Sequence, residues 1–485
     1  MNFTLLHEPA RMFVAGEWLD TEETNPVENP ATGETVTTVP VATTEIINRA
    51  VAGAVEAQRE WGKRTYAERA AVLQRIIGLV DENLEELAQI VVAEQGKPLT
   101  DARGEIGGVK AFFDFPASQR YREVGQLVAP NSDMQHIITK EYPVGVVVAI
   151  IPWNFPAAIF ARKVAPALMA GNAIIVKPSG ETPLSSLALA KICQLAGLPD
   201  GLLSVLTGPG RVVGNQLVEH PDTDMITVTG STRAGKQILA AAAEKIITVS
   251  LELGGKAPFL IFDDADLDAA VDMAVEARLM NCGQVCTCNE RLFVQRGVYD
   301  EVVRRVIQQF EATKVGDPMI EGTKMGPKVS GAERDKVAKF IDDAIAAGAK
   351  LECGGSGDVD GMPEGGHWMK PTVLTQVTND MDIAQHEVFG PVLPIIPFDT
   401  YEEVVEWANS TDYGLTAYAY TSDLSQALRL TDDLHFGEVY INQAGPETVQ
   451  AFHTGWKLSG LGGDDGPNGF EKYLRKKSLY LNYAN

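Results

Sequence analysis

The sequence predicts an α/β protein with two parallel-sheet domains and a small β arm. Apolar strand-like runs alternate with helical runs from Gly145 to about Gly255, and a second alternating region follows Ala257. The apolar runs are continuous, which is typical of parallel strands that are covered on both faces. A chain of 485 residues is long enough for two or three domains.

The N-terminal part has its own pattern. FVAGEWLDTEETNPVENPATGETVTTVP contains short strand-like runs between Asn-Pro and Thr-Gly turn signals. From Thr43 to about Ala93 the apolar residues recur with helical spacing, first in EIINRAVAGAVEAQREW and then in ERAAVLQRIIGLVDENLEELAQIVV. We therefore expect short strands followed by two helical segments.

Strand–helix pairs make up the first alternating region. GVVVAIIP leads to PAAIFARKVAPALMAG, NAIIVKPS to LSSLALAKICQLAG, LLSVLTG to RVVGNQLVEH, and MITVTGS to TRAGKQILAAAAE, before the strand KIITVSLELGG. The second region contains similar pairs, such as RLFVQRGVYDEVVRRVIQQFEAT. Ligands of such sheets bind at the carboxyl ends of the strands.

Composition and charge exclude several classes of protein. A net charge of −24 disfavours nucleic acid and anionic membranes as partners, because a carboxylate-rich surface repels phosphate. The C-terminal KYLRKKSLYLNY is basic, but this global charge favours an edge strand that pairs with another subunit. The start lacks a signal-peptide pattern, and five cysteines are an odd and low number. We expect a cytoplasmic protein without disulfides.

Three of the five cysteines lie in NCGQVCTCNE, Asn281–Glu290. They do not predict a zinc site, since a structural site needs four ligands and no histidine is near, and we expect no metal. Buried cysteines commonly fill space, and two of these three are expected to do so. Gly283 and Gln284 form a bend just before Cys286, as an exposed nucleophile requires.

Five motifs resemble those of the aldehyde dehydrogenase superfamily, in the family's order and over nearly the whole chain. The resemblance implies an aldehyde-dehydrogenase-like fold and the oxidation of an aldehyde to its acid with NAD or NADP. The motifs are PWNFP (Pro152–Pro156), TGSTRAGK (Thr229–Lys236), LELGGK (Leu251–Lys256), NCGQVC (Asn281–Cys286) and EVFGP (Glu387–Pro391).

The resemblance assigns the catalytic roles to three residues. Cys286 adds to the aldehyde, giving a thiohemiacetal and then a thioester. The Asn154 side chain and the Cys286 backbone N–H stabilise the oxyanion, although Asn154 could instead cap a turn. Glu252 activates the water that hydrolyses the thioester, which implies a free acid product rather than acyl transfer to coenzyme A. The alternative for Glu252 is a solvated charge at a strand end.

The resemblance also implies a dinucleotide site with a phosphate at a helix start. The chain departs from the family's NAD-preferring K-P-S-E-x-T-P, because KPSGETP has Gly180 where a ribose-binding acid would be. NAD and NADP therefore both stay open, with Lys177 as a phosphate partner, and for Phe389 core packing is an alternative. The expected cofactor-binding residues are Ile151, Trp153, Lys177, Ser179, Gly180, Gly210, Gly214, Gly230, Ser231, Leu253, Glu387 and Phe389.

The segment QAFHTGWKLSGLGGDDG, Gln450–Gly466, resembles the lactaldehyde and glycolaldehyde dehydrogenase branch. That resemblance implies a small polar aldehyde contacted by Arg162, Glu447 and His453, with Thr287 beside the nucleophile where the branch often has Asn. Arg162 could instead form an ion pair, and His453 could be a buried, hydrogen-bonded loop residue. A semialdehyde dehydrogenase, with Arg162 holding a distal carboxylate, is the alternative substrate class.

The expected subunit has three parts and assembles into a homodimer or homotetramer. A cofactor-independent thiol hydrolase using Cys286 and Glu252 is an alternative of another class, although such enzymes usually pair the cysteine with a histidine. A structural protein that kept the fold is a further alternative. The expected ranges are 1–124 and 143–253 for the dinucleotide-binding domain, 254–462 for the catalytic domain, and 125–142 with 463–485 for the arm.

Overall fold

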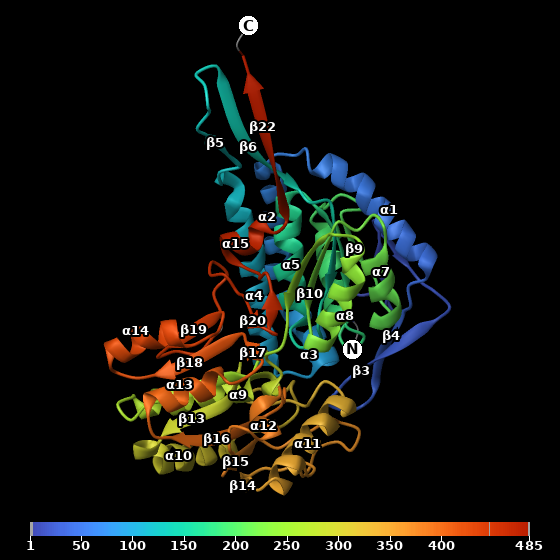
Figure 1. Cartoon of the computed structure of the whole chain (residues 1–485). Coiled ribbons are helices and arrows are strands. Elements are labelled where there is room, and N and C mark those ends of the chain that lie inside the picture. Colours follow the sequence, from blue (N-terminus) through green and yellow to red (C-terminus); the bar gives the residue numbers. More distant parts are fainter. Residues whose placement is uncertain (1–2, 446, 484–485) are drawn as a thin grey trace.

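The computed structural model describes residues 3–445 and 447–483 (Figure 1). Two large sheets, one three-stranded sheet and two strand pairs organise these residues. The strand pairs are β3 (Thr24–Glu28) with β4 (Thr35–Pro40), and β17 (Tyr413–Gly414) with β20 (Trp456–Lys457). Within the described part of the chain, no helix combines the length and apolar composition that crossing a membrane requires.

The first sheet has eight strands and a parallel centre. In spatial order they are β2 (Glu17–Leu19), β1 (Met12–Val14), β9 (Leu203–Val205), β8 (Ala173–Lys177), β7 (Val146–Ile150), β10 (Met225–Thr229), β11 (Thr248–Glu252) and β21 (Gly460–Leu461). The chain runs outward from β7 to β9 and then returns to the other side of β7 with β10 and β11. The crevice beyond the carboxyl ends at such a reversal is the usual ligand site.

Helices of the first half build one apolar core with this sheet. The helical pattern between Thr43 and Ala93 forms three helices rather than two, because Asn83 ends the second by donating from its side chain to the Leu79 carbonyl at 2.7 Å. The helices are α1 (Thr44–Trp61), α2 (Tyr66–Glu82), α3 (Leu84–Gln95), α4 (Leu99–Ser118), α5 (Pro156–Ala170), α6 (Leu184–Leu195) and α7 (Asn215–Glu219). A further helix, α8 (Thr232–Ala243), packs in a smaller core with β10 and β11.

The second sheet has seven strands, all parallel except β14. Its side chains alternate between two cores: Leu260 and Phe293 face one, while Phe259 and Leu292 face the other. The strands are β14 (Lys350–Cys353), β15 (Thr372–Thr375), β16 (Val392–Phe398), β13 (Asn289–Gln295), β12 (Ala257–Ile261), β18 (Thr416–Tyr420) and β19 (Glu438–Ile441). The helices are α9 (Leu267–Leu279), α10 (Tyr299–Ala312), α11 (Gly331–Ala346), α12 (Asp382–Gln385), α13 (Tyr401–Asn409) and α14 (Leu424–Asp433). The last helix, α15 (Gly466–Glu471), packs instead on α5, with Phe470 in the first core.

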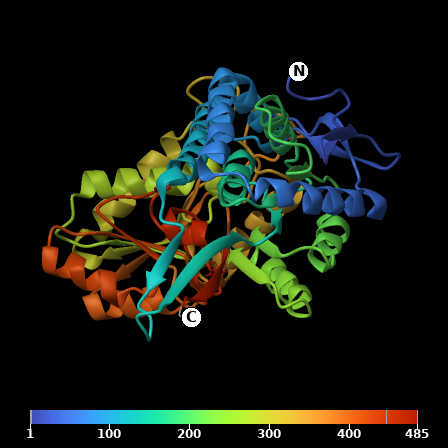
Figure 2. The same cartoon turned by 90° about the horizontal axis from the view of Figure 1, so that it is seen from above.

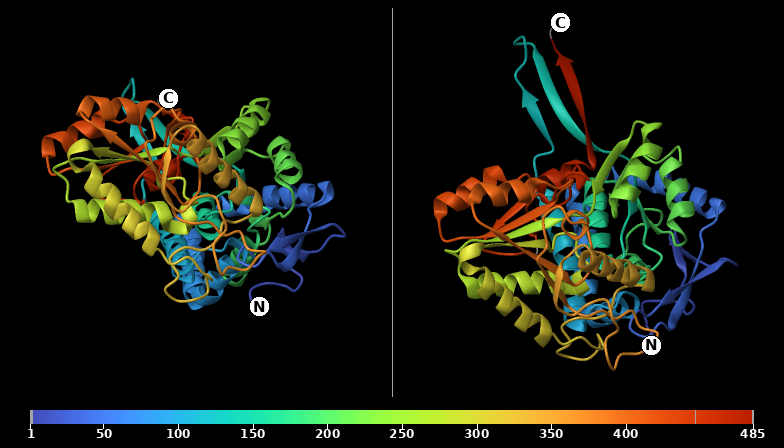
Figure 3. Two further views of the ribbon diagram at one scale, coloured as in Figure 1. Left: turned by 90° about the horizontal axis from the view of Figure 1, so that it is seen from below. Right: turned by 60° about the horizontal axis from the view of Figure 1, so that its bottom comes forward.

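A three-stranded arm projects away from both large sheets (Figures 1 and 3). The C-terminal strand β22 (Leu474–Asn482) pairs with β6 (Gln135–Pro143), which pairs with β5 (Gly125–Val128). The outer strands expose apolar side chains, including Leu127 at 73% and Tyr480 at 68% of their surface. Within the described residues, β5 and β22 are the edges of this sheet.

The two large sheets meet where β11 continues into β12. Viewed from above, the green helices of the first sheet and the orange helices of the second lie on opposite sides of the molecule (Figure 2). The expected range 254–462 does not follow this division completely. Gly460 and Leu461 pair with Glu252 and Leu251, so β21 joins the first sheet and ties the C-terminal segment to the end of β11.

Candidate active site

Cys286 lies in a tightly folded loop between α9 and β13. Asn281, Cys282 and Gly283 have φ angles of 49°, 56° and 69°, so three successive residues adopt the left-handed conformation. The Arg278 guanidinium holds the bend by donating to the Gly283 carbonyl at 2.8 Å. Cys286 is half-buried, whereas Cys282 and Cys288 are buried, as expected for fillers. The loop therefore leaves one of its three thiols partly accessible.

Gln284 ties this loop to its surroundings. Its side-chain amide donates to the Asn281 carbonyl at 3.0 Å, and its side-chain oxygen accepts from the Val329 N–H at 3.0 Å. Its backbone carbonyl accepts from the Asn154 side chain at 3.0 Å. The structure thereby places the predicted oxyanion amide two residues from the predicted nucleophile.

Asn154 is itself held by a buried network that the sequence did not reveal. Its carbonyl accepts from the Lys97 ammonium at 2.8 Å and from the Asn281 side chain at 2.9 Å. Lys97 forms a fully buried ion pair with Glu105 at 2.5 Å. The other Glu105 oxygen accepts from the backbone N–H of Ala157 at 2.8 Å, at the start of α5. The start of α5, the Lys97–Glu105 ion pair and the Asn154 backbone are therefore joined by direct hydrogen bonds.

Glu252 ends β11 and is buried, with 3% of its surface exposed. Among the described residues, neither carboxylate oxygen has a hydrogen-bond partner. The His453 Nε2 atom lies 3.7 Å from Glu252 Oε2. Burial raises the pKa of Glu252 to about 8, although the charge of His453 acts in the opposite direction. A carboxyl with such a pKa can exchange a proton near neutral pH, and it is not the solvated strand-end charge considered above.

The surroundings of Cys286 are acidic. Burial, together with Glu447 and Glu387, raises the pKa of the Cys286 thiol, and only Arg162 among its main charged neighbours acts against this. The Gly255 Cα approaches the Cys286 carbonyl so closely that an added Cβ would lie 2.7 Å from it. The segment after Glu252 and the cysteine loop are therefore in direct contact.

The predicted substrate residues form ion pairs. The Arg162 guanidinium contacts Glu447 at 2.6 Å and Asp465 at 2.8 Å, so the ion-pair alternative describes Arg162 in this structure. His453 is buried with Nδ1 3.0 Å from Glu438 Oε1, as in the alternative of a hydrogen-bonded loop residue. Thr287 is also buried, and its carbonyl accepts from Thr416 at 3.0 Å.

Further charges that the sequence did not single out complete this cluster. Lys163 on α5 contacts Asp464 at 2.8 Å, and Lys472 contacts the same carboxylate. The sequence PAAIFARKVAPALMAG contains a pattern that could have predicted this burial, because two basic residues, Arg162 and Lys163, interrupt an apolar helix. Both side chains are buried. Asp465 and Asp464, which pair with Arg162 and Lys163, lie far away along the chain in the segment GGDDG.

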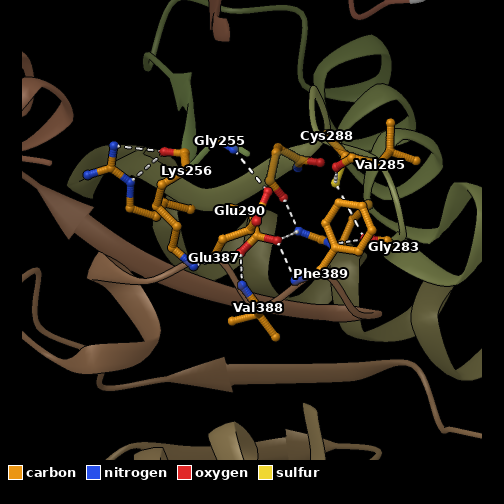
Figure 4. Close-up of polar contacts among 12 residues, drawn as sticks. Gly255, Lys256, Gly283, Val285, Cys288, Glu290, Glu387, Val388 and Phe389 are labelled. Carbon is orange, nitrogen blue, oxygen red and sulfur yellow. Dashed lines mark hydrogen bonds and ion pairs between the residues drawn. The ribbon is translucent and has the colours of Figure 1, made fainter. Parts of the chain in front are cut away.

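Glu387 and Phe389 are held next to the cysteine loop by Glu290 (Figure 4). Glu290 accepts from the backbone N–H groups of Val388 and Phe389, both at 3.0 Å. Its charge is balanced by Lys256 at 2.7 Å and Arg278 at 3.1 Å. Glu387 accepts from the Gly255 N–H at 2.9 Å. The Phe389 ring packs edge-on against Trp153 with ring centres 5.3 Å apart.

The predicted dinucleotide residues line the carboxyl ends of the first sheet. At Gly180, Gly210 and Gly230 a Cβ atom would meet nothing within 4 Å, so the backbone borders open space. Ser231 caps α8, a helix long enough to attract an anion. Lys177 is buried, burial lowers its pKa to about 8, and its ammonium donates to the Pro178 carbonyl. These features fit a nucleotide with its phosphates.

The remaining cofactor residues support this edge. Ile151 and Leu253 are buried, and the Ile151 N–H donates to the Lys177 carbonyl at 3.1 Å. Gly214 packs near Ile150, and the Ser179 hydroxyl donates to Glu181. Within the described part of the chain, no group of three or more His, Cys, Asp or Glu side chains is arranged so that it could hold a metal ion.

Comparison with known proteins gives consistent results. A family model described as "Aldehyde dehydrogenase family" matches residues 18–479. The 3,6-anhydro-alpha-L-galactose dehydrogenase of Streptomyces coelicolor is 58% identical, over 99% of this chain and 98% of that protein. The lactaldehyde dehydrogenase of Escherichia coli is 39% identical, over 96% and 95%. A solved structure of a 3,6-anhydro-L-galactose dehydrogenase in complex with NAP has a TM-score of 0.95 at 44% identity, over 97% and 99%. The resemblance to the lactaldehyde branch is therefore weaker than the one to this other group.

Proposed function

Since the chain belongs to the aldehyde dehydrogenase family and is an NAD(P)-dependent aldehyde dehydrogenase, we propose that it oxidises a hydroxyl-rich aldehyde of the 3,6-anhydro-L-galactose class to the acid. The cluster of carboxylates around Arg162 is the observation that carries this proposal. Carboxylates accept hydrogen bonds from hydroxyl groups, and Glu447, Asp465 and Glu438 provide several such acceptors. The 58% identical relative bears the same substrate in its name.

The proposed chemistry uses three side chains. The Cys286 sulfur, as the thiolate, forms a bond to the aldehyde carbon while Asn154 and the Cys286 N–H donate to the oxygen. After oxidation the carbon is a thioester. A water oxygen then attacks this carbon, Glu252 takes a proton from the water, the carbon–sulfur bond breaks, and the acid leaves with the Cys286 thiolate restored.

The dinucleotide, when bound, accepts the hydride that leaves the aldehyde carbon. Lys177, Ser179 and Ser231 would hold its ribose and phosphate groups, and Glu387 with Phe389 would hold its nicotinamide end. Ile151, Trp153, Gly214 and Leu253 would line its path. Gly180 supplies no carboxylate against a 2′-phosphate, so we propose that both NAD and NADP are accepted.

Two other substrate classes are distinguished by Arg162. A semialdehyde with a distal carboxylate needs an unpaired cation, but two carboxylates already neutralise Arg162. Lactaldehyde or glycolaldehyde is the second candidate, favoured by the same carboxylates and by the 39% identical relative. A cofactor-independent hydrolase would form no NADH or NADPH, which separates that alternative directly.

We further propose the three-part subunit expected from the sequence, with the arm as an oligomerisation element. Support comes from the exposed apolar side chains on both outer strands of the arm, Leu127 and Tyr480 among them. Exposed edges of this kind pair with another chain. A homodimer or homotetramer is the proposed assembly.

A spectrophotometric panel tests the proposed function. Initial rates of NADH or NADPH formation are measured with 3,6-anhydro-L-galactose, lactaldehyde, glycolaldehyde, succinic semialdehyde and a long-chain aldehyde. We expect the highest kcat/KM for the anhydro sugar. Cys286→Ala should abolish oxidation, and Glu252→Gln should give one equivalent of reduced cofactor per site and then stall. Steady turnover by Glu252→Gln, or a preference for the long-chain aldehyde, would contradict the proposal.

A further inference from the structure

His453 lies between two carboxylates from different parts of the chain. Its Nδ1 atom is 3.0 Å from Glu438 Oε1 at the start of β19, and its Nε2 atom is 3.7 Å from Glu252 Oε2 at the end of β11. The backbone fixes the ring's position, because His453 and Asp464 exchange N–H···O hydrogen bonds at 3.0 and 2.8 Å. A ring held in this way presents Nε2 to the Glu252 carboxylate, whose oxygens have no hydrogen-bond partner among the described residues.

We propose that Glu438 and His453 are positioning residues for Glu252: the imidazolium, held by Glu438, stabilises the ionised form of the Glu252 carboxylate and directs it for thioester hydrolysis. This inference rests on the proposed base role of Glu252. It gives His453 a task in the second half of the reaction, whereas a substrate-contacting histidine would act on aldehyde binding.

The charges around His453 support a cationic ring. Burial lowers the pKa of His453, and so does Arg162, but the hydrogen bond to Glu438 and the charges of Glu252 and Glu447 outweigh them and raise the pKa to about 10. An imidazole in this environment carries its proton at neutral pH. It then donates from Nδ1 to Glu438 and has a proton on Nε2 toward Glu252.

The charges around Glu252 show what this cation does. Burial raises the pKa of Glu252 most, and Asp464 raises it further, while His453, Lys163 and Lys472 lower it. The two lysines already pair with Asp464. His453 is therefore the cation whose removal should most increase the protonated fraction of Glu252. A protonated Glu252 cannot take the proton from the attacking water, so the thioester should persist.

The test follows the Cys286 thioester directly. Enzyme saturated with cofactor is mixed with less than one equivalent of glycolaldehyde or 3,6-anhydro-L-galactose, and the acyl adduct is quantified by intact-mass spectrometry from pH 5.5 to 9.5. His453→Asn keeps a polar partner for Glu438 but removes the charge. In His453→Asn we expect the thioester to decay about tenfold more slowly, or slower still, at pH 7. The acid limb of the pH–rate profile, where the decay rate falls as the pH falls, should move up by about 1 to 3 pH units. Glu438→Gln should move this acid limb in the same direction but by less. The double variant, Glu438→Gln with His453→Asn, should have the same acid limb as His453→Asn alone.

Controls separate the possible failures. His367 forms a histidine–carboxylate pair with Glu28 at 2.5 Å outside this cluster, so His367→Asn should decay like the parent. Glu252→Gln should accumulate thioester; if it does not, the proposed base role itself fails. If Glu252→Gln accumulates thioester but His453→Asn and Glu438→Gln keep the parental acid limb, or change only the aldehyde KM, this inference is wrong. Should His453→Asn form no thioester, Glu438→Gln decides by the same criterion.

Discussion

The buried pair Lys97–Glu105 gives the sharpest stability prediction. Both side chains are fully buried, and the Lys97 ammonium contacts only Glu105, the Asn154 carbonyl and the face of Phe155 among the interactions described. Glu105→Ala leaves this ammonium without its counter-charge and removes the acceptor for the first N–H groups of α5. Breaking one partner of a buried ion pair costs about 3–5 kcal/mol.

The cost translates into a measurable shift. A loss of about 1 kcal/mol lowers the unfolding midpoint of a domain of this size by roughly 2–4 °C. Calorimetry of Glu105→Ala should therefore show a first transition lowered by about 6 °C or more. The matched control is Glu85→Ala, which breaks the half-exposed pair with Arg103 at 2.8 Å and should shift the midpoint by only a few degrees, because exposed pairs contribute about 0–1 kcal/mol.

A double variant separates stability from catalysis. Replacing both charges, as in Lys97→Met with Glu105→Leu, should restore much of the midpoint, because apolar residues of similar volume avoid the buried unpaired charge. Oxidation by the double variant should nevertheless be slow, since Lys97→Met removes the ammonium donor of the Asn154 carbonyl. A Glu105→Ala midpoint within about 2 °C of the parent, below the smallest shift worked out above, would refute the reasoning.

Two further predictions concern the cofactor and the assembly. Glu290→Gln leaves Lys256 and Arg278 without their counter-charge and loosens the Val388–Phe389 backbone. Initial-rate kinetics should therefore show a cofactor KM raised about tenfold, with the aldehyde KM nearly unchanged. An unchanged cofactor KM would show that Glu290 does not hold the cofactor-binding residues in place. Leu127→Arg combined with Tyr480→Arg should lower the mass measured by light scattering after gel filtration, whereas Ile320→Arg, on another exposed surface, should leave it unchanged.

The sequence predicted the parts of this fold that local pattern determines. The runs at β7 and β8 are strands because continuous apolar residues favour a sheet covered on both faces, and both strands are buried. The bend before Cys286 was expected from Gly283, but the left-handed conformations of Asn281 and Cys282 were not. Non-glycine residues adopt this conformation only when their surroundings compensate, here through Arg278 and Gln284.

Side-chain partners across long sequence distances were beyond prediction. Glu252 and His453 were singled out separately, for water activation and for substrate contact, and nothing in either motif indicates that they face each other. Their proximity depends on β21, which pairs with β11 and brings the segment around His453 to the end of that strand. Likewise Glu105 lies in an ordinary helical stretch, and only the packing of α4 on α5 gives it a role.

The charge balance of the buried cluster explains why Glu252 can act as a base near neutral pH. Five carboxylates, those of residues 252, 438, 447, 464 and 465, lie among three basic side chains, Arg162, Lys163 and Lys472, and one imidazole. With His453 protonated, the cluster has one excess negative charge when Glu252 is ionised and none when Glu252 is protonated. Taking a proton from water therefore removes the excess charge of this cluster, while the negative charge passes to the water oxygen that bonds to the thioester carbon. Without the imidazolium the ionised state has two excess charges, which raises the pKa of Glu252 further and leaves a smaller fraction of the carboxylate able to accept the proton.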